Sequence, residues 1–341
     1  MAYRERELTQ PVRLCDDRGR LNPSAVGWSR RPLHTCSLAG YPMRKKKWNY
    51  WCVTSDTHLF SATVSDIDYL GLAFVYYLHF DSKAFTEKTV AVPFGWGCDL
   101  PDTVEGDIAF DRSGLQVSFR REPGPVTRLE VASQDFGGVP LEADLSVEHP
   151  RGHETLNVVV PWSETRFQFT SKQNCLPASG VVRLGGETIV FERGKTFACL
   201  DFGRGVWPYS SCWNWASFSG AAEDGTRVGV NLGAGWTDGT GMTENALWVD
   251  GRVAKLSEEV VFSYDPADFM RPWRLRTSES DRVELEFIPF FERVAKTDLL
   301  LLKSEVHQMI GRFSGTVAGH DGRRLRVEGV VGWAEEHRAR W

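Results

Sequence analysis

The sequence predicts an all-β protein built as a tandem duplication of two antiparallel β-barrels. Segments that alternate apolar and polar residues, or form short β-branched and aromatic runs, recur from Trp48 onward, and no helix-length periodic segment competes with them. Aromatic residues reach 12%, with 13 Trp, while 32 Gly and 16 Pro supply turns. Short motifs of the first half recur in the second half, which indicates the duplication.

The length and charge of the chain bound its organisation and its partners. At 341 residues it is long enough for about two domains. Its 42% hydrophobic and 25% charged residues are typical of globular proteins with a substantial core. The formal net charge of -5 and the pI near 6.0 give no field that attracts polyanions, so no nucleic-acid partner is expected.

Neither the N-terminus nor the cysteine pattern indicates export or a membrane span. The opening MAYRERELTQ is charged where a signal peptide is apolar, and no run of about 18 apolar residues occurs. The 7 cysteines are odd in number, dispersed and without a C-x-x-C pair. We expect reduced thiols, no catalytic cysteine, no transmembrane segment and a cytoplasmic location.

The predicted strands follow a polar lead-in segment. Residues 1–45 contain Pro11, Pro23, Pro32 and Pro42, spaced so that no long helix forms. The first half then contains the strand-like segments LFSATVSD, LAFVYYLHF, TVAVPF, GLQVSFRR, TRLEVAS, LEADLSVEH and LNVVVPW. The second half contains TRVGVNLGAG, NALWVDG, EEVVFSYD, RVELEFIPF, FSGTVAG and LRVEGVVGW. Turn residues bound these segments.

Three pairs of motifs indicate the internal repeat. WNYW at 48–51 corresponds to WNWA at 213–216, and GLQVSF, which begins at Gly114, corresponds to RVELEF, which begins at Arg282. Each half also closes alike, at 179–207 and at 314–341, with Ser-Gly, a strand, a turn, a second strand, then charged residues, Arg and Trp. Chance similarity between two β-domains of like composition is the alternative, because short alternating patterns are weakly specific.

Many short antiparallel strands in each half favour closed barrels, because closure removes exposed strand edges. A two-sheet sandwich stays open as an alternative, since alternation alone does not separate the two architectures. We expect an extended lead-in segment over residues 1–45, an N-terminal barrel over 46–205 and a C-terminal barrel over 206–341. A barrel of about eight strands can enclose one ligand.

The densest concentration of polar and aromatic residues lies between Leu200 and Gly220. Its candidate site residues are Asp201, Arg204, Trp207, Trp213, Asn214 and Trp215. In a strand Trp213 and Trp215 share one face, so their indoles can line a cavity that holds an apolar ligand or a developing cation. The alternative is that the tryptophans pack between domains and that Asp201 forms an ion pair with Arg204.

A glycine-rich segment over residues 231–251 contains the next candidates, Glu244 and Asn245. Its glycines are spaced G-x-G-x-x-x-G, and no helix follows to bind a pyrophosphate, so we expect no nucleotide cofactor here. Glu244 and Asn245 sit where a barrel strand begins and are expected to face the lumen. A surface turn is the alternative.

His307 is the remaining catalytic candidate, because a histidine inside an apolar barrel can transfer protons near neutral pH. It can equally be a structural group. Glu335, Glu336 and His337 are further candidates, because they are equivalent in the repeat to the Asp201 region; the alternative is that they simply form a charged terminus. His149 and His153 are separated by a turn containing Pro150, so we expect no metal site.

Five long segments carry a family resemblance: DFGRGVWPYSSCWNWASFSG, NLGAGWTDGTGMTENALWVDG, PWRLRTSESDRVELEFIPF, KSEVHQMIGRFSG and GWAEEHRARW. With them the chain resembles the domain of unknown function 2804 (DUF2804) family over most of its length. That family resembles, more distantly, the two-barrel lipocalin-like proteins that include carotenoid 1,2-hydratases, hydroxyneurosporene synthases and some natural-product cyclases. The resemblance implies a lipocalin-like fold more directly than an activity.

The leading functional hypothesis is an enzyme that needs no organic cofactor and protonates a largely apolar small molecule, followed by hydration, cyclisation or isomerisation. A carboxyl group desolvated in an apolar cavity has a raised pKa and can act as a general acid, a role open to Asp201 or Glu244. The expected supporting roles are cation stabilisation by Trp213 and Trp215, water positioning by Asn214 or His307, and orientation of Asp201 or a substrate anion by Arg204.

Two other classes of function stay open. One is a non-catalytic carrier or sensor of a hydrophobic lipid or terpenoid, which needs an apolar lumen with few polar groups. The other is carbohydrate hydrolysis, since indoles stack on sugars and paired carboxyl groups cleave glycosidic bonds. The asymmetry of the two repeats places the expected cavity in the C-terminal barrel and its seam, with the N-terminal barrel bracing it. The sequence does not determine the oligomeric state or the substrate.

Overall fold

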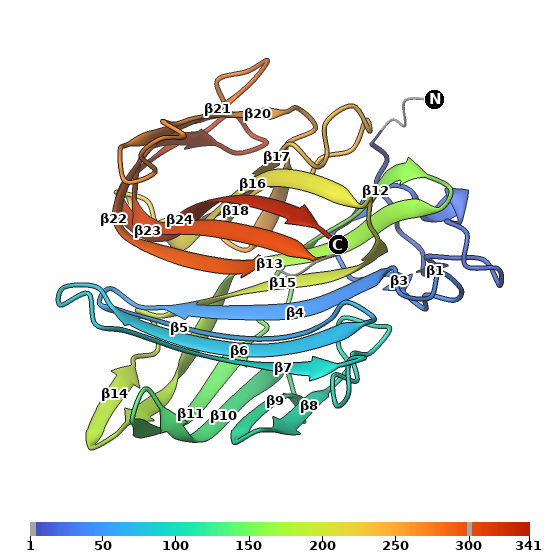
Figure 1. Ribbon diagram of the computed structural model, residues 1–341. Coiled ribbons are helices and arrows are strands. Elements are labelled where there is room, and N and C mark those ends of the chain that lie inside the picture. Colours follow the sequence, from blue (N-terminus) through green and yellow to red (C-terminus); the bar gives the residue numbers. More distant parts are fainter. Residues whose placement is uncertain (1–4, 299–301) are drawn as a thin grey trace.

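A computed structural model describes residues 5–298 and 302–341 and confirms the predicted fold class (Figure 1). The chain is almost entirely β-structure and forms two curled antiparallel sheets, one a near-barrel and the other a half-barrel. The first sheet contains β2 (Trp28–Ser29), β4 (Lys45–Thr54), β5 (His58–Asp66), β6 (Leu70–His79), β7 (Phe85–Pro93), β8 (Ile108–Arg112), β9 (Leu115–Glu122), β10 (Val126–Phe136), β11 (Val139–Glu148), β12 (Leu156–Ser163), β13 (Arg166–Leu184), β14 (Glu187–Phe191) and β15 (Phe197–Val206).

The second sheet contains β16 (Ser210–Ala221), β17 (Arg227–Ala234), β18 (Ala246–Val249), β19 (Arg252–Lys255), β20 (Val260–Ser263), β21 (Trp273–Thr277), β22 (Val283–Asp298), β23 (Lys303–Ala318) and β24 (Arg324–Arg340). In the lead-in, β1 (Val12–Arg13) pairs in parallel with β3 (His34–Thr35), and a single 3₁₀ turn, η1 (Pro23–Ala25), lies between them. No helix within the described residues has the length and apolar character that a membrane crossing requires.

Both sheets follow the same path. The first runs β7-β6-β5-β4-β15-β13-β11-β10-β9-β8, and the second runs β19-β18-β17-β16-β24-β23-β22-β21-β20. In each, a four-strand meander is followed by strands that return to pair the last strand with the first, β15 with β4 and β24 with β16. The WNYW and WNWA motifs occupy these first strands.

The alternation of apolar residues and the position of glycines in the sequence account for the hairpin formed by β10 and β11. Along β10 the burial pattern alternates, which is the period of a strand with one face on the core. Phe136 pairs with Val139 around Gly137 and Gly138, whose φ angles of 67° and 93° suit a two-residue turn that other residues disfavour.

A third hydrophobic core joins the two sheets and positions the site. Besides one core within each sheet, the face of β4, β5 and β6 packs on β16, β23 and β24 through Tyr50, Tyr76, Trp215, Ile310 and Trp333. The rings of Tyr50 and Trp215 meet edge to face at 5.8 Å. The first repeat motif therefore packs against the second across the interface.

Candidate functional site

A cavity of about 540 Å³ lies between the two sheets, beside this core. Strands β4 to β7, β13 and β15 contribute its lining from one side, and β16 and β22 to β24 contribute from the other. Six tryptophans line it: Trp48, Trp207, Trp213, Trp215, Trp236 and Trp341. Ile67, Leu70, Leu72 and Phe74 extend the apolar wall. The cavity is suited to a largely apolar molecule.

A buried lysine forms the polar centre of the cavity. Lys172 of β13 lies 2.9 Å from Asp201 Oδ1 and 3.0 Å from Glu244 Oε2, and its Nζ lies 4.6 Å from the centroid of the Trp215 ring. Burial opposes its charge, but the two carboxylates outweigh burial and raise the pKa of Lys172 above its ordinary value. The ammonium is therefore held charged.

Glu244 is anchored on all sides. Its Oε1 accepts a hydrogen bond from Trp236 Nε1 at 2.7 Å, and its side chain is 2% exposed. Gly233 of β17 permits this position, because a Cβ atom there would lie 2.1 Å from Glu244 Oε1. Burial raises the pKa of Glu244, while Lys172 opposes that rise. Its contacts make Glu244 a structural partner of the lysine.

Glu335 of β24 is a second buried carboxyl group in the same cavity. Trp213 Nε1 and Gln308 Nε2 each donate to it at 3.3 Å, and Gln308 Oε1 accepts from the Tyr76 hydroxyl at 2.9 Å. Desolvation raises the pKa of Glu335 to about 7. A carboxyl group with that pKa is partly protonated near neutral pH, as a general acid must be.

His337 lines the same wall in its neutral form. Burial lowers the pKa of this imidazole to about 3. Its ring lies 4.0 Å from that of Trp213, and Nε2 lies 2.8 Å from Ser304 Oγ. The ring therefore adds a neutral polar group beside the indoles.

The structure brings five of the sequence-predicted residues to this cavity: Asp201, Trp207, Trp213, Trp215 and Glu244. The expectation that the N-terminal half only braces the site is not met. Trp48, Tyr50, Lys172 and Asp201 all come from the first sheet and line the same cavity. Both repeats therefore build the site.

Arg204 lies on the other face of β15 from Asp201 and does not orient that carboxyl group. They are three positions apart along the strand, and strand alternation turns them to opposite faces. Arg204 is fully buried and donates to the carbonyls of Trp48 at 2.8 Å and Pro101 at 2.9 Å. It also donates to Asn49 Oδ1 at 2.8 Å. Its role is to tie strands together, and it forms no ion pair with Asp201.

Three further predicted residues lie outside the cavity lining. Asn214 donates to the Tyr264 hydroxyl at 3.1 Å, and Asn245 accepts from the Gly233 amide at 2.7 Å. His307 contacts Glu292 Oε1 at 2.7 Å, and its ring packs 4.6 Å from Phe269. Gln308 faces the cavity, so alternation turns His307 away from it. None of the three is placed to position water there.

Lys172 and Gln308 were not among the predicted site residues. Glu335 was a candidate through its equivalence to the Asp201 region, but no role was predicted for it. The sequence carried no signal for Lys172, because the polar residues of FQFTSKQNCL at 167–176 are typical of a strand with one face in solvent, and only the structure shows that all ten residues are buried. A buried lysine requires a counterion, and that requirement points to carboxylates nearby.

Comparison with known proteins places the chain in a family. The family model for a domain of unknown function, DUF2804, matches residues 5–341. The chain belongs to the DUF2804 family. No match was found among the curated proteins.

Solved structures show which known fold this family shares. A candidate AttH from Nitrosomonas europaea aligns with a TM-score of 0.50 and 14% identity, over 86% of this chain and 92% of that one. CghA with Sch210972 aligns with a TM-score of 0.52 and 12% identity, over 87% and 89%. Kievitone hydratase from Nectria haematococca aligns with a TM-score of 0.49 and 11% identity, over 86% and 88%. The DUF2804 chain therefore shares the fold of the first two over most of its length.

Proposed function

We propose that this DUF2804 protein binds a largely apolar small molecule in the inter-sheet cavity and catalyses its hydration, cyclisation or isomerisation, with Glu335 as the general acid. The observation that carries the proposal is a buried carboxyl group that opens on a cavity walled by six tryptophans. CghA, which shares the fold, was crystallised with the small molecule Sch210972. We extend small-molecule binding to this chain as part of the proposal.

The proposed step begins with proton transfer from the Glu335 carboxyl group to a carbon of a C=C bond. The π electrons form the new C–H bond, and the other carbon becomes cationic. Trp213 and Trp215 present indoles to that cation. A second double bond of the same molecule can attack the cation, which forms a C–C bond and moves the charge to another carbon. The final cation either loses a neighbouring proton or adds water, whose extra proton is then released. Asp201 accepts the released proton, and transfer of that proton through water to the Glu335 carboxylate restores the starting state.

Lys172 gives the polar end of the cavity a fixed charge distribution. With Asp201 and Glu244 it forms a cluster that carries two negative charges and one positive charge. The two carboxylates of the cluster can stabilise a substrate cation. Burial keeps the pKa of Glu335 high, while Lys172 lowers it and Asp201 raises it. Asp201 is the more accessible partner, with a side chain 14% exposed against 2% for Glu244. We assign Asp201 the role of positioning the ammonium and of accepting a proton in the quenching step.

The test is a turnover screen with terpenoids, polyenes and unsaturated lipids, using the wild-type protein and Glu335→Gln. The wild type is expected to convert at least one class, and the variant to bind it without conversion. Glu336→Gln is the matched control, because Glu336 is equally buried but pairs with Arg338 at 2.8 Å on the opposite face of β24. Full turnover by Glu335→Gln would overturn the assignment.

A carrier of hydrophobic molecules is the second candidate, and one observation favours it. Lys172, Asp201 and Glu244 satisfy one another, which leaves the indoles as the main surface for a ligand. Native mass spectrometry of protein purified from its own host distinguishes the two functions. A stoichiometric, chemically unaltered lipid that Glu335→Gln binds with equal affinity supports the carrier, whereas a product present only with the wild type supports the enzyme.

A further inference from the structure

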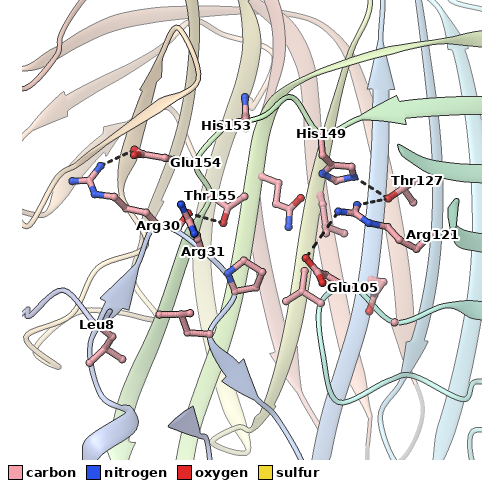
Figure 2. A pocket seen from close by; sticks show the side chains of 18 of the residues that line it. Leu8, Arg30, Arg31, Glu105, Arg121, Thr127, His149, His153, Glu154 and Thr155 are labelled. Atoms are coloured by element: carbon pink, nitrogen blue, oxygen red, sulfur yellow. Dashed lines mark hydrogen bonds and ion pairs between the residues drawn. The ribbon is translucent and has the colours of Figure 1, made fainter. Parts of the chain in front are cut away.

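A second cavity, of about 690 Å³, lies behind the wall formed by β4, β13 and β15. We call it the first-sheet cavity. Because side chains alternate along a strand, the two faces of this wall line different cavities. Tyr50 and Lys172 line the inter-sheet cavity, while their neighbours Trp51 and Gln173 line the first-sheet cavity. The lead-in and residues 152–155 contribute to its rim, and Arg121 projects into it from β9 (Figure 2).

We propose that the first-sheet cavity binds a small organic anion, whose carboxylate or phosphate pairs with Arg121 and whose hydroxyl or amide group donates to Gln173. This site is separate from the inter-sheet cavity, and the proposal does not depend on the function proposed above. Trp51, Phe119 and Leu200 supply the apolar part of its wall.

The guanidinium of Arg121 forms only a weak ion pair with a carboxylate. Its Nη1 donates to Thr127 Oγ1 at 3.0 Å, and Nη2 lies 4.0 Å from Glu105 Oε1. Because the Glu105 side chain is 67% exposed, that ion pair is at the distance limit and screened by water. A guanidinium has five N–H donors, so Arg121 can hold an anionic group in a bidentate manner.

Four arginines line the cavity, and they differ in pairing and exposure: Arg31 is exposed, and Arg252 pairs with Glu154 at 2.9 Å. Arg30 is already paired, with Glu154 at 2.7 Å and Glu7 at 2.9 Å. His149 approaches Thr127 Oγ1 at 2.8 Å, and burial lowers the pKa of this imidazole to about 3, so it is neutral near pH 7 (Figure 2). We therefore assign the anion to the half-buried guanidinium of Arg121 rather than to the exposed one of Arg31.

Gln173 provides an independent indication that a ligand fills the cavity. Its side chain is buried, and its Oε1 has no hydrogen-bond partner among the described residues. A buried amide oxygen without a donor is costly unless a bound molecule supplies one. The side chain is directed by a bulge, since the pairing of β13 with β15 shifts between Gln173 and Leu176. Within that bulge Asn174 donates to Ser217 Oγ at 2.7 Å, which fixes the bulge to the second sheet.

Isothermal titration calorimetry tests the proposal with inorganic phosphate, citrate, glucose 6-phosphate and, as the uncharged comparison, glucose. We expect binding of the anions but not of glucose. Glucose 6-phosphate should bind more tightly than inorganic phosphate, because its sugar hydroxyls can donate to Gln173 while its phosphate pairs with Arg121. Gln173→Leu should remove that advantage while leaving phosphate binding unchanged.

Arg121→Gln should weaken anion binding about tenfold or more, the loss expected for a charge-assisted pair. Arg120→Gln is the matched control, because Arg120 adjoins it on β9 but faces outward and pairs with Glu130. Arg121→Lys keeps the charge without the bidentate geometry, and an intermediate loss is expected even if Arg121→Gln fails to fold. Absence of binding for all three anions, equal binding of glucose, or wild-type affinity in both Arg121 variants would overturn the proposal. Glu335→Gln should leave this binding unchanged.

Discussion

Asp201 and Glu335 occupy equivalent positions in the two halves of the chain. Asp201 of β15 pairs with Tyr50 of β4, and Glu335 of β24 pairs with Trp215 of β16. Tyr50 and Trp215 are the third residues of WNYW and WNWA, so the registers coincide. Each repeat therefore contributes one carboxyl group, from the same position, to one shared cavity.

The residues that pair with these two carboxyl groups from the next strand differ in charge. On the other side of Asp201 the paired residue of β13 is Lys172, whereas the residue opposite Glu335 on β23 is Gln308. A lysine stabilises a carboxylate beside it, and a neutral amide does so far less. The repeat thus provides an ion-paired carboxylate in one half and a carboxyl group that is partly protonated near neutral pH in the other.

The first prediction concerns the pH dependence of stability. Burial raises the pKa of Glu335 from 4.5 to about 7, so the native state binds more protons than the unfolded state between these values. The stabilising effect of the protonated form is fully present below pH 4.5 and is lost as the pH rises through 7, by roughly 3 kcal/mol in unfolding free energy. Urea denaturation over this range should show a shallower decline for Glu335→Gln than for the wild type. Parallel curves would contradict the prediction.

The second prediction exchanges the neighbour of Glu335. Gln308→Lys places an ammonium where the first repeat has Lys172, and it should lower the pKa of Glu335. Turnover of a substrate found in the screen described above is measured as a function of pH. The alkaline limb of this pH–activity profile should move to lower pH, and activity at neutral pH should fall. Gln308→Met, which adds no charge, is the control. A profile unchanged in Gln308→Lys would show that Glu335 does not act as the acid.

The third prediction concerns the buried ion cluster. Lys172→Met leaves Asp201 and Glu244 buried without their cation, and it should lower the unfolding free energy by about 3–5 kcal/mol. Lys195→Met is the control, because the exposed pair of Lys195 with Glu192 contributes little. Guanidinium denaturation measures both variants. Adding Glu244→Gln to Lys172→Met should restore part of the loss, since only one uncompensated carboxylate then remains.

The fourth prediction tests whether both repeats build the cavity. Trp48→Ala and Trp213→Ala should each weaken binding of a polyene such as retinol by about tenfold, or ~1.4 kcal/mol in binding free energy. Trp273→Ala is the matched control, because Trp273 is fully buried in the core of the second sheet, away from the cavity. It should cost about 3–5 kcal/mol of stability and leave the affinity of the folded protein unchanged. Normal retinol affinity in folded Trp48→Ala protein would exclude the first repeat from the binding wall.

The fifth prediction uses a glycine in the wall. A Cβ atom at Gly203 would lie 2.2 Å from Cε2 and Cζ2 of Trp48, so Gly203→Ala forces that indole to move. We expect a loss of about 1–3 kcal/mol in unfolding free energy, typical of overpacking, together with altered ligand affinity. Combining Gly203→Ala with Trp48→Leu should recover part of the lost stability, because the smaller side chain removes the indole contact, while Gln168 Nε2, at 2.6 Å from the new Cβ atom, must still shift. A fully additive double variant would contradict this explanation.

The sequence by itself predicted the strands and the repeat because both are local properties. Alternation identifies residues that share a strand face, and WNYW and WNWA identify the equivalent first strands. The same local rules predicted that Trp213 and Trp215 line a cavity, and they already related residues 335–337 to the region of Asp201. The relative faces of two residues on one strand also follow from the sequence, since a spacing of three places Arg204 opposite Asp201.

Only the tertiary structure decided which faces meet. Lys172, Asp201, Glu244 and Glu335 lie on strands from both sheets, and their convergence depends on how the two curled sheets pack on each other. Alternation divides each strand into two faces but does not say which of them faces the other sheet. The ion pairs of Lys172 depend on that packing, because a buried lysine is stable only where the fold places carboxylates within contact distance.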